Sequence, residues 1–111
     1  MKNIERTVEY YYTSEGKAPF AEWYASVEDK KIQQVVDVRI ARVQQGHFGD
    51  CSFVGNGIYE LRIHLGSGWR IYFGQVSGYV VLLLRGGSKK SQSLDIEKAK
   101  MYFTDYKRRL K

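Results

Sequence analysis

The sequence predicts an α+β domain with an antiparallel four-stranded sheet, a helix hairpin packed on one face and a further helix at the C-terminus. The first observation is a series of three apolar runs separated by short glycine-containing breaks, the pattern of a β-meander. The second is the helical spacing of apolar residues on either side of that series. With 43% hydrophobic residues and one proline in 111 residues, we expect a single folded domain spanning residues 1–111.

The three predicted strands of the meander are Ile58–Leu65, Trp69–Val76 and Tyr79–Arg85. Alternation along these strands gives two faces of different character. One face is apolar and is expected to form the wall of the core. The other face carries most of the charged side chains, with Val81 and Leu83 among them.

Pairing follows from the lengths of the two connections. A three-residue loop at residues 66–68 places His64 opposite Arg70 and Arg62 opposite Tyr72. A two-residue turn at residues 77–78 places Arg70 opposite Arg85. One predicted row therefore holds His64, Arg70 and Arg85, and the next row holds Arg62 and Tyr72.

Like charges directly opposite one another destabilise a sheet, so this row needs an explanation. One explanation is a site for an anion such as a phosphodiester. The other is an ordinary wet sheet face on which Glu60 and solvent neutralise the arginines. Spacing alone leaves both open.

The remaining elements are assigned from turn residues and periodicity. A fourth strand is predicted at residues 6–13, and Pro19 suits the first turn of a helix. A capping-box pattern from Ser26 to Asp29 opens a second helix that ends near Gly46. Residues 46–57 are expected to form a glycine-rich loop, and Ser93 is the expected cap of the last helix.

Charge and composition limit the function classes. Residues 1–37 carry a net charge of −2 and residues 38–111 a net charge of +8, which suits a polyanionic partner or a basic protein without one. Cys51 is the only cysteine, and its spacing from His47 and His64 does not suit metal binding, so we expect no metal and no cofactor. No apolar run approaches ~18 residues and the N-terminus lacks a signal-peptide pattern, so we expect no membrane span and a cytoplasmic location.

An ordered set of short motifs resembles the RelE/ParE toxin superfamily, and within it the HigB-like, phage-derived addiction module killer proteins. The motifs are Glu60-Leu61-Arg62, Gly66-Ser67-Gly68, Trp69-Arg70-Ile71-Tyr72, the apolar strand at residues 80–84, Gly87-Ser88-Lys89-Lys90 and Ala99 in the last helix. The order of elements matches over essentially the whole chain. The resemblance implies a RelE-like fold.

The resemblance also implies a function. Relatives of the RelE and HigB kind are toxins of type II toxin–antitoxin pairs, which enter the ribosomal A site and cleave mRNA through the ribose 2′-hydroxyl without a metal. Arg62, Arg70 and one of Lys89 and Lys90 match the basic residues of the family. The implied partners are mRNA on the ribosome and a cognate antitoxin, expected to be a helix-turn-helix protein from the neighbouring gene.

We expect Arg62, His64, Arg70 and Arg85 to be catalytic, with Tyr72, Lys89 and Lys90 binding substrate. The general base is left open by the family pattern, since residues 91–96 hold none of the tyrosines found there in RelE-type proteins. His64 is the candidate because an unperturbed imidazole titrates near neutrality. Two alternatives remain: a non-catalytic gyrase inhibitor like ParE, and an RNA- or partner-binding module of the same fold.

Overall fold

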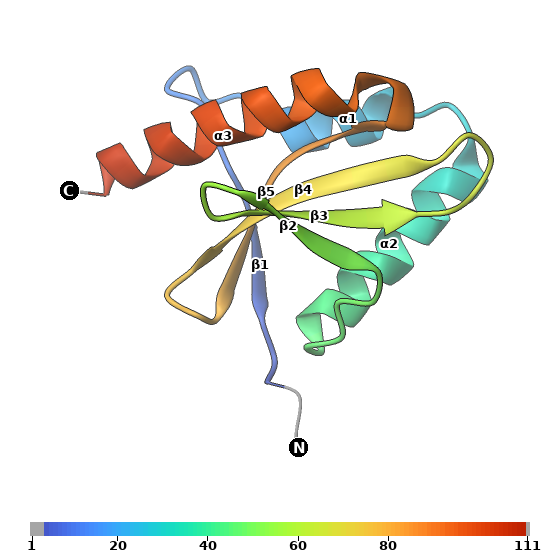
Figure 1. Cartoon of the computed structure of the whole chain (residues 1–111), viewed down its shortest axis with the longest axis horizontal. Helices are drawn as coiled ribbons and strands as arrows, with labels where there is room; N and C mark the ends of the chain where they lie inside the picture. Colours follow the sequence, from blue (N-terminus) through green and yellow to red (C-terminus); the bar gives the residue numbers. More distant parts are fainter. Residues whose placement is uncertain (1–3, 111) are drawn as a thin grey trace.

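A computed structural model describes residues 4–110, which form one mixed sheet of five strands with helices on both faces (Figure 1). The strand order is β1-β5-β4-β3-β2. The first strand runs parallel to β5 and every other neighbouring pair is antiparallel. The α+β class is confirmed, whereas the prediction of four antiparallel strands is wrong. Residues 1–3 and 111 of the predicted domain lie outside the described residues.

The elements follow one another as β1 (Thr7–Tyr10), α1 (Pro19–Ser26), α2 (Lys30–Gln44), β2 (Cys51–Gly55), β3 (Ile58–Ile63), β4 (Trp69–Val76), β5 (Val80–Ser88), the 3-10 turn η1 (Lys89–Ser91) and α3 (Gln92–Arg109). Pro19 begins α1, as predicted. Asp29 caps α2, where its side chain accepts a 2.8 Å hydrogen bond from the Lys31 backbone N–H. The last helix begins earlier than predicted, because Ser91 rather than Ser93 occupies its N-cap position.

The predicted glycine-rich loop contains β2, which is an edge strand paired with β3. Two of its glycines, Gly55 and Gly57, form a register irregularity and a tight turn in the β2–β3 pair, where the sequence had predicted a long loop. Gly57 follows Asn56 in the tight turn between the two strands, and both have positive φ, 79° and 53°. Gly55, at φ 98°, lies at a register irregularity that begins at Phe53. A short strand whose second half is a bulge and a turn has no clean alternation in its sequence.

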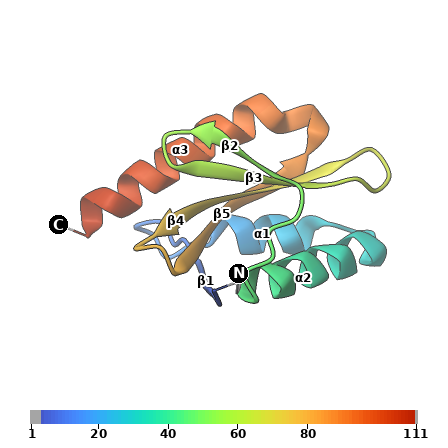
Figure 2. The ribbon, with the colours of Figure 1, turned by 60° about the horizontal axis from the view of Figure 1, so that its bottom comes forward.

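Both faces of the sheet are covered: α1 and α2 lie on one side and α3 lies on the other (Figure 2). We call these the hairpin face and the α3 face. The core under the hairpin face includes Leu61, Ile71 and Phe73. The core under the α3 face includes Tyr72, which packs with Phe103 of α3. The first two helices therefore lie where the sequence predicted them, while the face predicted to be wet is half covered by a helix.

The register of β5 differs from the prediction near the turn. The turn has three residues, 77–79, so Val76 pairs with Val80. Ser77 and Gly78 both have positive φ there, 50° and 80°. The extra turn residue reverses the facing of the strand: Val81 and Leu83 are buried under the hairpin face and are not part of a basic surface.

A bulge restores the original facing further along β5. Phe73 pairs with Leu83, but Tyr72 pairs with Arg85, which leaves Leu84 as the extra residue. Leu84 and Arg85 are therefore both on the α3 side, and Leu84 joins the core there. The extra turn residue and the extra bulge residue each reverse the facing of β5 once. Arg85 therefore lies on its predicted face even though the predicted turn is wrong.

The third helix is held to the rest of the fold by close packing against the sheet and by a hydrogen bond from Tyr11. Phe103 lies so close to Gly74 that a Cβ atom on Gly74 would come within 2.7 Å of its ring. The Tyr11 hydroxyl donates a 2.6 Å hydrogen bond to Asp105. Burial, and then this hydrogen bond, raise the pKa of Tyr11 to about 12. In the described part of the chain, no helix has the length and apolar character needed to cross a bilayer.

Candidate functional site

Of the predicted site residues, Arg62, His64 and Arg70 lie at the loop end of the β3–β4 hairpin. Arg62 and Arg70 are directly paired across these strands, on the α3 face. The prediction had paired His64 with Arg70. The hairpin loop is longer than predicted, residues 64–68, because β3 ends at Ile63 opposite Trp69. A shift of two residues changes the partners and leaves every side chain on its predicted face.

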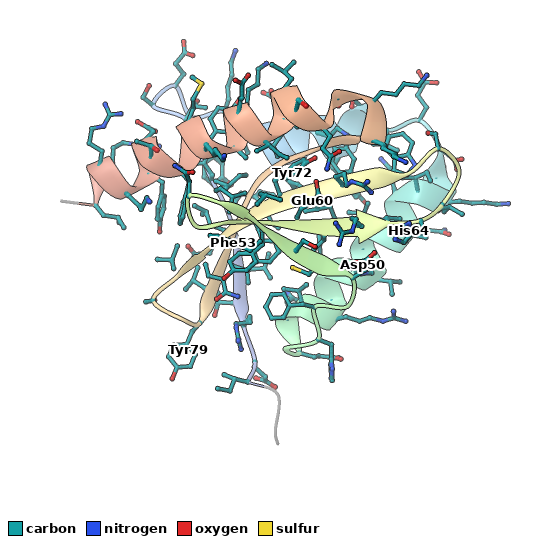
Figure 3. All side chains as sticks on the ribbon, viewed as in Figure 1. Asp50, Phe53, Glu60, His64, Tyr72 and Tyr79 are labelled. Carbon is teal, nitrogen blue, oxygen red and sulfur yellow. The ribbon has the colours of Figure 1, made fainter. Side chains whose placement is uncertain are left out.

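Asp50, in the segment before β2, joins two of the predicted residues. One of its carboxylate oxygens accepts a 3.1 Å hydrogen bond from Arg62 Nε, and the other lies 2.5 Å from His64 Nε2. Figure 3 shows Asp50 and His64 next to each other beyond the end of β3. The hydrogen bonds from Arg62 and then His64 lower the pKa of Asp50 to about 2. This residue was not predicted as part of the site.

The pairing with Asp50 fixes the orientation of His64. A carboxylate at Nε2 favours the tautomer with the proton on that nitrogen, which leaves Nδ1 as the proton acceptor. The His64 side chain is 71% exposed, so Nδ1 is accessible to a large substrate. An imidazole held in this way is suited to general base catalysis.

Glu60 lies under α3 at the centre of the arginine cluster and is 1% exposed (Figure 3). Its carboxylate accepts hydrogen bonds from Arg62 Nη1 at 3.2 Å and from Gln92 Nε2 at 2.7 Å. Arg70 Nε lies 3.7 Å away, close enough for an ion pair but not for a hydrogen bond. The like-charged pair Arg62–Arg70 is thus compensated by a buried carboxylate, which the second sequence-based explanation had named.

Two polar atoms in this cluster are buried without a hydrogen-bond partner among residues 4–110: Arg70 Nε and the Tyr72 hydroxyl. Burial, followed by the nearby charge of Glu60, raises the pKa of Tyr72, so its hydroxyl stays protonated at neutral pH. Tyr72 is completely buried. Contact of its side chain with a substrate, as predicted, requires movement of α3.

Arg85 is directed to α3. Its Nε donates a 2.5 Å hydrogen bond to Asp95, whose other oxygen accepts a 2.5 Å hydrogen bond from Ser91 Oγ. Arg85 lies opposite Tyr72, and the position opposite Arg70 is Gly87. A Cβ atom on Gly87 would lie 1.9 Å from the Asp95 carboxylate, so glycine is needed there for close docking of the helix. Arg85 therefore takes part in an ion pair that fixes the start of α3.

Lys89 and Lys90 are exposed in η1, next to the hairpin loop. The Lys89 backbone N–H donates a 3.1 Å hydrogen bond to the Gly68 carbonyl, which joins η1 to that loop. The two lysines and His64 are therefore at the same end of the sheet. Arg62, Arg70, Lys89 and Lys90 exceed Asp50 and Glu60 by two positive charges when His64 is neutral.

Metal ligands are not gathered anywhere in the described residues, since no group of three or more His, Cys, Asp or Glu side chains suited to a metal ion occurs there. Cys51 is half buried in β2 as a free thiol, and burial raises its pKa. A protonated, partly covered thiol is a poor nucleophile.

The fold and the site together define a small α+β protein with a cationic cluster and an aspartate-oriented histidine at one end of its sheet. The chain belongs to a phage-derived family: residues 24–107 match the sequence model described as "Phage derived protein Gp49-like (DUF891)". A relative from Haemophilus influenzae is 40% identical over 82 residues, which cover 74% of this chain and 83% of the relative. That relative is described only as an uncharacterized protein.

Proposed function

We propose that this protein is the toxin of a type II toxin–antitoxin pair and that it cleaves mRNA on the ribosome. The observation that carries the proposal is the Asp50–His64 pair, 2.5 Å apart, beside Arg62 and Arg70. Phosphodiester cleavage needs a proton acceptor next to fixed positive charge. The resemblance to RelE and HigB toxins implies the same reaction, and membership of a phage-derived family fits a toxin.

In the proposed reaction His64 Nδ1 takes the proton of a ribose 2′-hydroxyl, and the 2′-oxygen attacks the adjacent phosphorus. The new O–P bond closes a 2′,3′-cyclic phosphate while the bond from phosphorus to the 5′-oxygen breaks. The leaving 5′-oxygen takes a proton from a water molecule and becomes a hydroxyl, and the imidazolium of His64 then returns its proton to solvent. Arg62 binds the phosphate oxygens as negative charge builds up, and the buried Arg70 adds positive charge behind it. The exposed Lys89 and Lys90 hold the flanking backbone.

Single-turnover cleavage of a 5′-labelled mRNA on purified ribosomes tests the proposal. We expect the wild-type protein to produce fragments ending in a 2′,3′-cyclic phosphate. His64→Ala should slow cleavage by about 10²- to 10⁴-fold, the usual contribution of a positioned general base. Lys31→Gln, which removes an exposed charge from the first turn of α2, is the matched control and should cleave at the wild-type rate.

The arginines are tested in the same assay. Arg62→Ala should lose cleavage while remaining folded, because Arg62 is half exposed. Arg70 is buried beside Glu60, so Arg70→Ala also destabilises the fold, by about 1–3 kcal/mol. Arg70→Lys keeps the charge and separates the two effects. Wild-type cleavage rates in folded His64→Ala and Arg62→Ala would reject the proposed site.

A non-catalytic toxin is the second candidate, because carboxylates already engage Arg62 and Arg85. Such a protein would arrest growth by binding, as a ParE-like gyrase inhibitor does, or would bind RNA without cleaving it. Inhibition of gyrase supercoiling by the wild-type protein, without any cleavage of ribosome-bound mRNA, would favour this candidate.

A further inference from the structure

A second basic surface lies beside the candidate site, at the C-terminal end of α2. A hollow of about 610 Å³ is lined there by Arg39, Arg42, His47 and the backbone of Gly46 and Gly49. Its lining includes three basic side chains and, within residues 4–110, no carboxylate side chain. We call this the α2-end hollow.

Two further features describe the charge around the hollow. Burial lowers the pKa of Arg39; the nearby charge of Asp50 opposes this effect, and the charge of the exposed Arg42 adds to it, so Arg39 and Arg42 are like charges held close together. Arg6 reaches the same region from the start of the chain. Its guanidinium lies 5.5 Å from the centre of the Phe48 ring, and its backbone N–H donates to the Gln44 carbonyl at 2.8 Å.

The hollow is physically joined to the candidate site by Arg39. Its guanidinium donates to the Arg62 carbonyl at 2.5 Å and to the Phe48 carbonyl at 3.1 Å. These bonds fix the turn that carries Asp50 against β3. A Cβ atom on Gly49 would lie 3.2 Å from Arg39 Nη2, so the turn passes tightly over this guanidinium. One side of the turn thus faces the hollow, and Asp50 on the same turn faces His64.

We propose that the α2-end hollow binds backbone phosphates of the same RNA strand that is cleaved at the candidate site, next to the cleaved phosphodiester. The inference rests on the proposed function for the choice of RNA as the ligand. Asp50 lies near Arg39 but does not line the hollow, and a lining with two arginines and no carboxylate among the described residues suits phosphate groups. The bidentate guanidinium of Arg42 is available on the surface. The nearest aromatic ring, Phe48, already contacts Phe73 and Arg6, so binding occurs through phosphates and is independent of base sequence.

Cations at this place also have a structural role, because the C-terminal end of a helix attracts positive charge. The two roles differ in what they predict. A helix-end role changes thermal stability and leaves RNA affinity untouched. A phosphate contact changes affinity and its dependence on salt, since each contact releases counterions from the nucleic acid.

The test measures binding of a fluorescent, 2′-O-methylated RNA oligonucleotide, which lacks the hydroxyl needed for cleavage, by anisotropy over a range of salt concentrations. We expect Arg42→Gln to weaken binding several-fold and to reduce the slope of log affinity against log salt by about 0.7, the value for one phosphate contact to a single strand. His47→Gln should act in the same direction. Oligonucleotides of different sequence should bind alike.

Lys31→Gln is the matched control, since it removes one positive charge from α2 about 16 Å from Arg42 along the helix axis. It should change neither affinity nor slope. Unchanged binding by Arg42→Gln and His47→Gln, or no RNA binding by the wild-type protein, overturns the inference. Cleavage by the wild-type protein with unchanged binding by Arg42→Gln rejects only the hollow, whereas Arg42-dependent binding without cleavage rejects only the nuclease.

Discussion

Asp50 determines how much of the candidate site is in place before any substrate binds. It contacts both Arg62 and His64, and the turn that carries it is fixed by Arg39. No sequence pattern marks this residue, because an aspartate in a glycine-rich segment is commonly a turn residue. Its role becomes visible only when β2 brings the segment alongside β3. A histidine near arginines is a weak candidate base until a carboxylate defines its tautomer.

The low pKa of Asp50 gives a prediction with a defined sign. Its pKa is about 2 in the folded protein and about 3.9 in an unfolded chain. Since folding depresses the pKa, the ionised carboxylate stabilises the fold fully above about pH 4, and this contribution is lost as the pH falls towards about 2.

We therefore expect Asp50→Asn to lower the free energy of unfolding at neutral pH, with the difference from wild type shrinking between about pH 4 and pH 2. Urea unfolding of both proteins across this range measures the difference directly. The His64 imidazole, followed by NMR, should change its tautomer equilibrium in Asp50→Asn. A pH-independent difference in stability would contradict the assignment of Asp50 as the partner of Arg62 and His64.

At the scale of secondary-structure elements, the docking of α3 decides what the α3 face can do. The helix buries Tyr72, closes over Glu60 and pairs Asp95 with Arg85. Its close approach depends on glycine at Gly74 in β4 and Gly87 in β5. Gly74 does not have a positive φ, so the requirement for glycine there comes from contact with Phe103 alone.

Gly74→Ala should therefore destabilise the protein by about 1–3 kcal/mol, the usual cost of overpacking a core. The added methyl group would overlap the Phe103 ring, which also lies close to Gly57 and has little room to move. Denaturant unfolding of Gly74→Ala, Phe103→Leu and the double variant forms a mutant cycle. We expect Gly74→Ala to cost less in the Phe103→Leu background, since leucine leaves room for the methyl group. Equal costs in both backgrounds would show that Phe103 is not the cause.

The elements also show what the sequence could and could not predict. Apolar periodicity and Pro19 located α1 and α2, and β4 has its predicted bounds, because each signal is local. The facing of Val81 and Leu83 was wrong because it depended on one residue of turn length at residues 77–79. The ion pairs of Arg85 with Asp95 and of Arg62 with Asp50 join residues 10 and 12 positions apart on different elements, and no spacing rule specifies such contacts.

For the whole molecule, the charge distribution is the property most relevant to partners. The acidic N-terminal third contributes α1 and most of α2, while the basic remainder contributes β2 to β5 and α3. Cationic residues lie at the loop end of the β3–β4 hairpin, at the C-terminal end of α2 and in the last turn of α3. Val81 and Leu83, which the sequence placed on the charged face, are buried and are not available to an antitoxin. We propose that an acidic segment of the antitoxin binds the half-exposed Arg62 and the exposed His64 and Lys89 instead.

Expression in bacteria tests the toxin proposal for the molecule as a whole. We expect the wild-type protein, expressed alone, to arrest growth and reduce protein synthesis, since cleavage on the ribosome removes mRNA. Co-expression of the helix-turn-helix protein expected from the neighbouring gene should restore growth, because an antitoxin covering the cationic residues competes with RNA. Folded His64→Ala should be harmless at equal soluble levels and should still bind the antitoxin, so loss of toxicity can be separated from loss of folding.

Normal growth with abundant folded wild-type protein would reject the toxin proposal. Arrest by both wild type and His64→Ala would instead favour a toxin that acts by binding, since only a cleaving enzyme depends on its base.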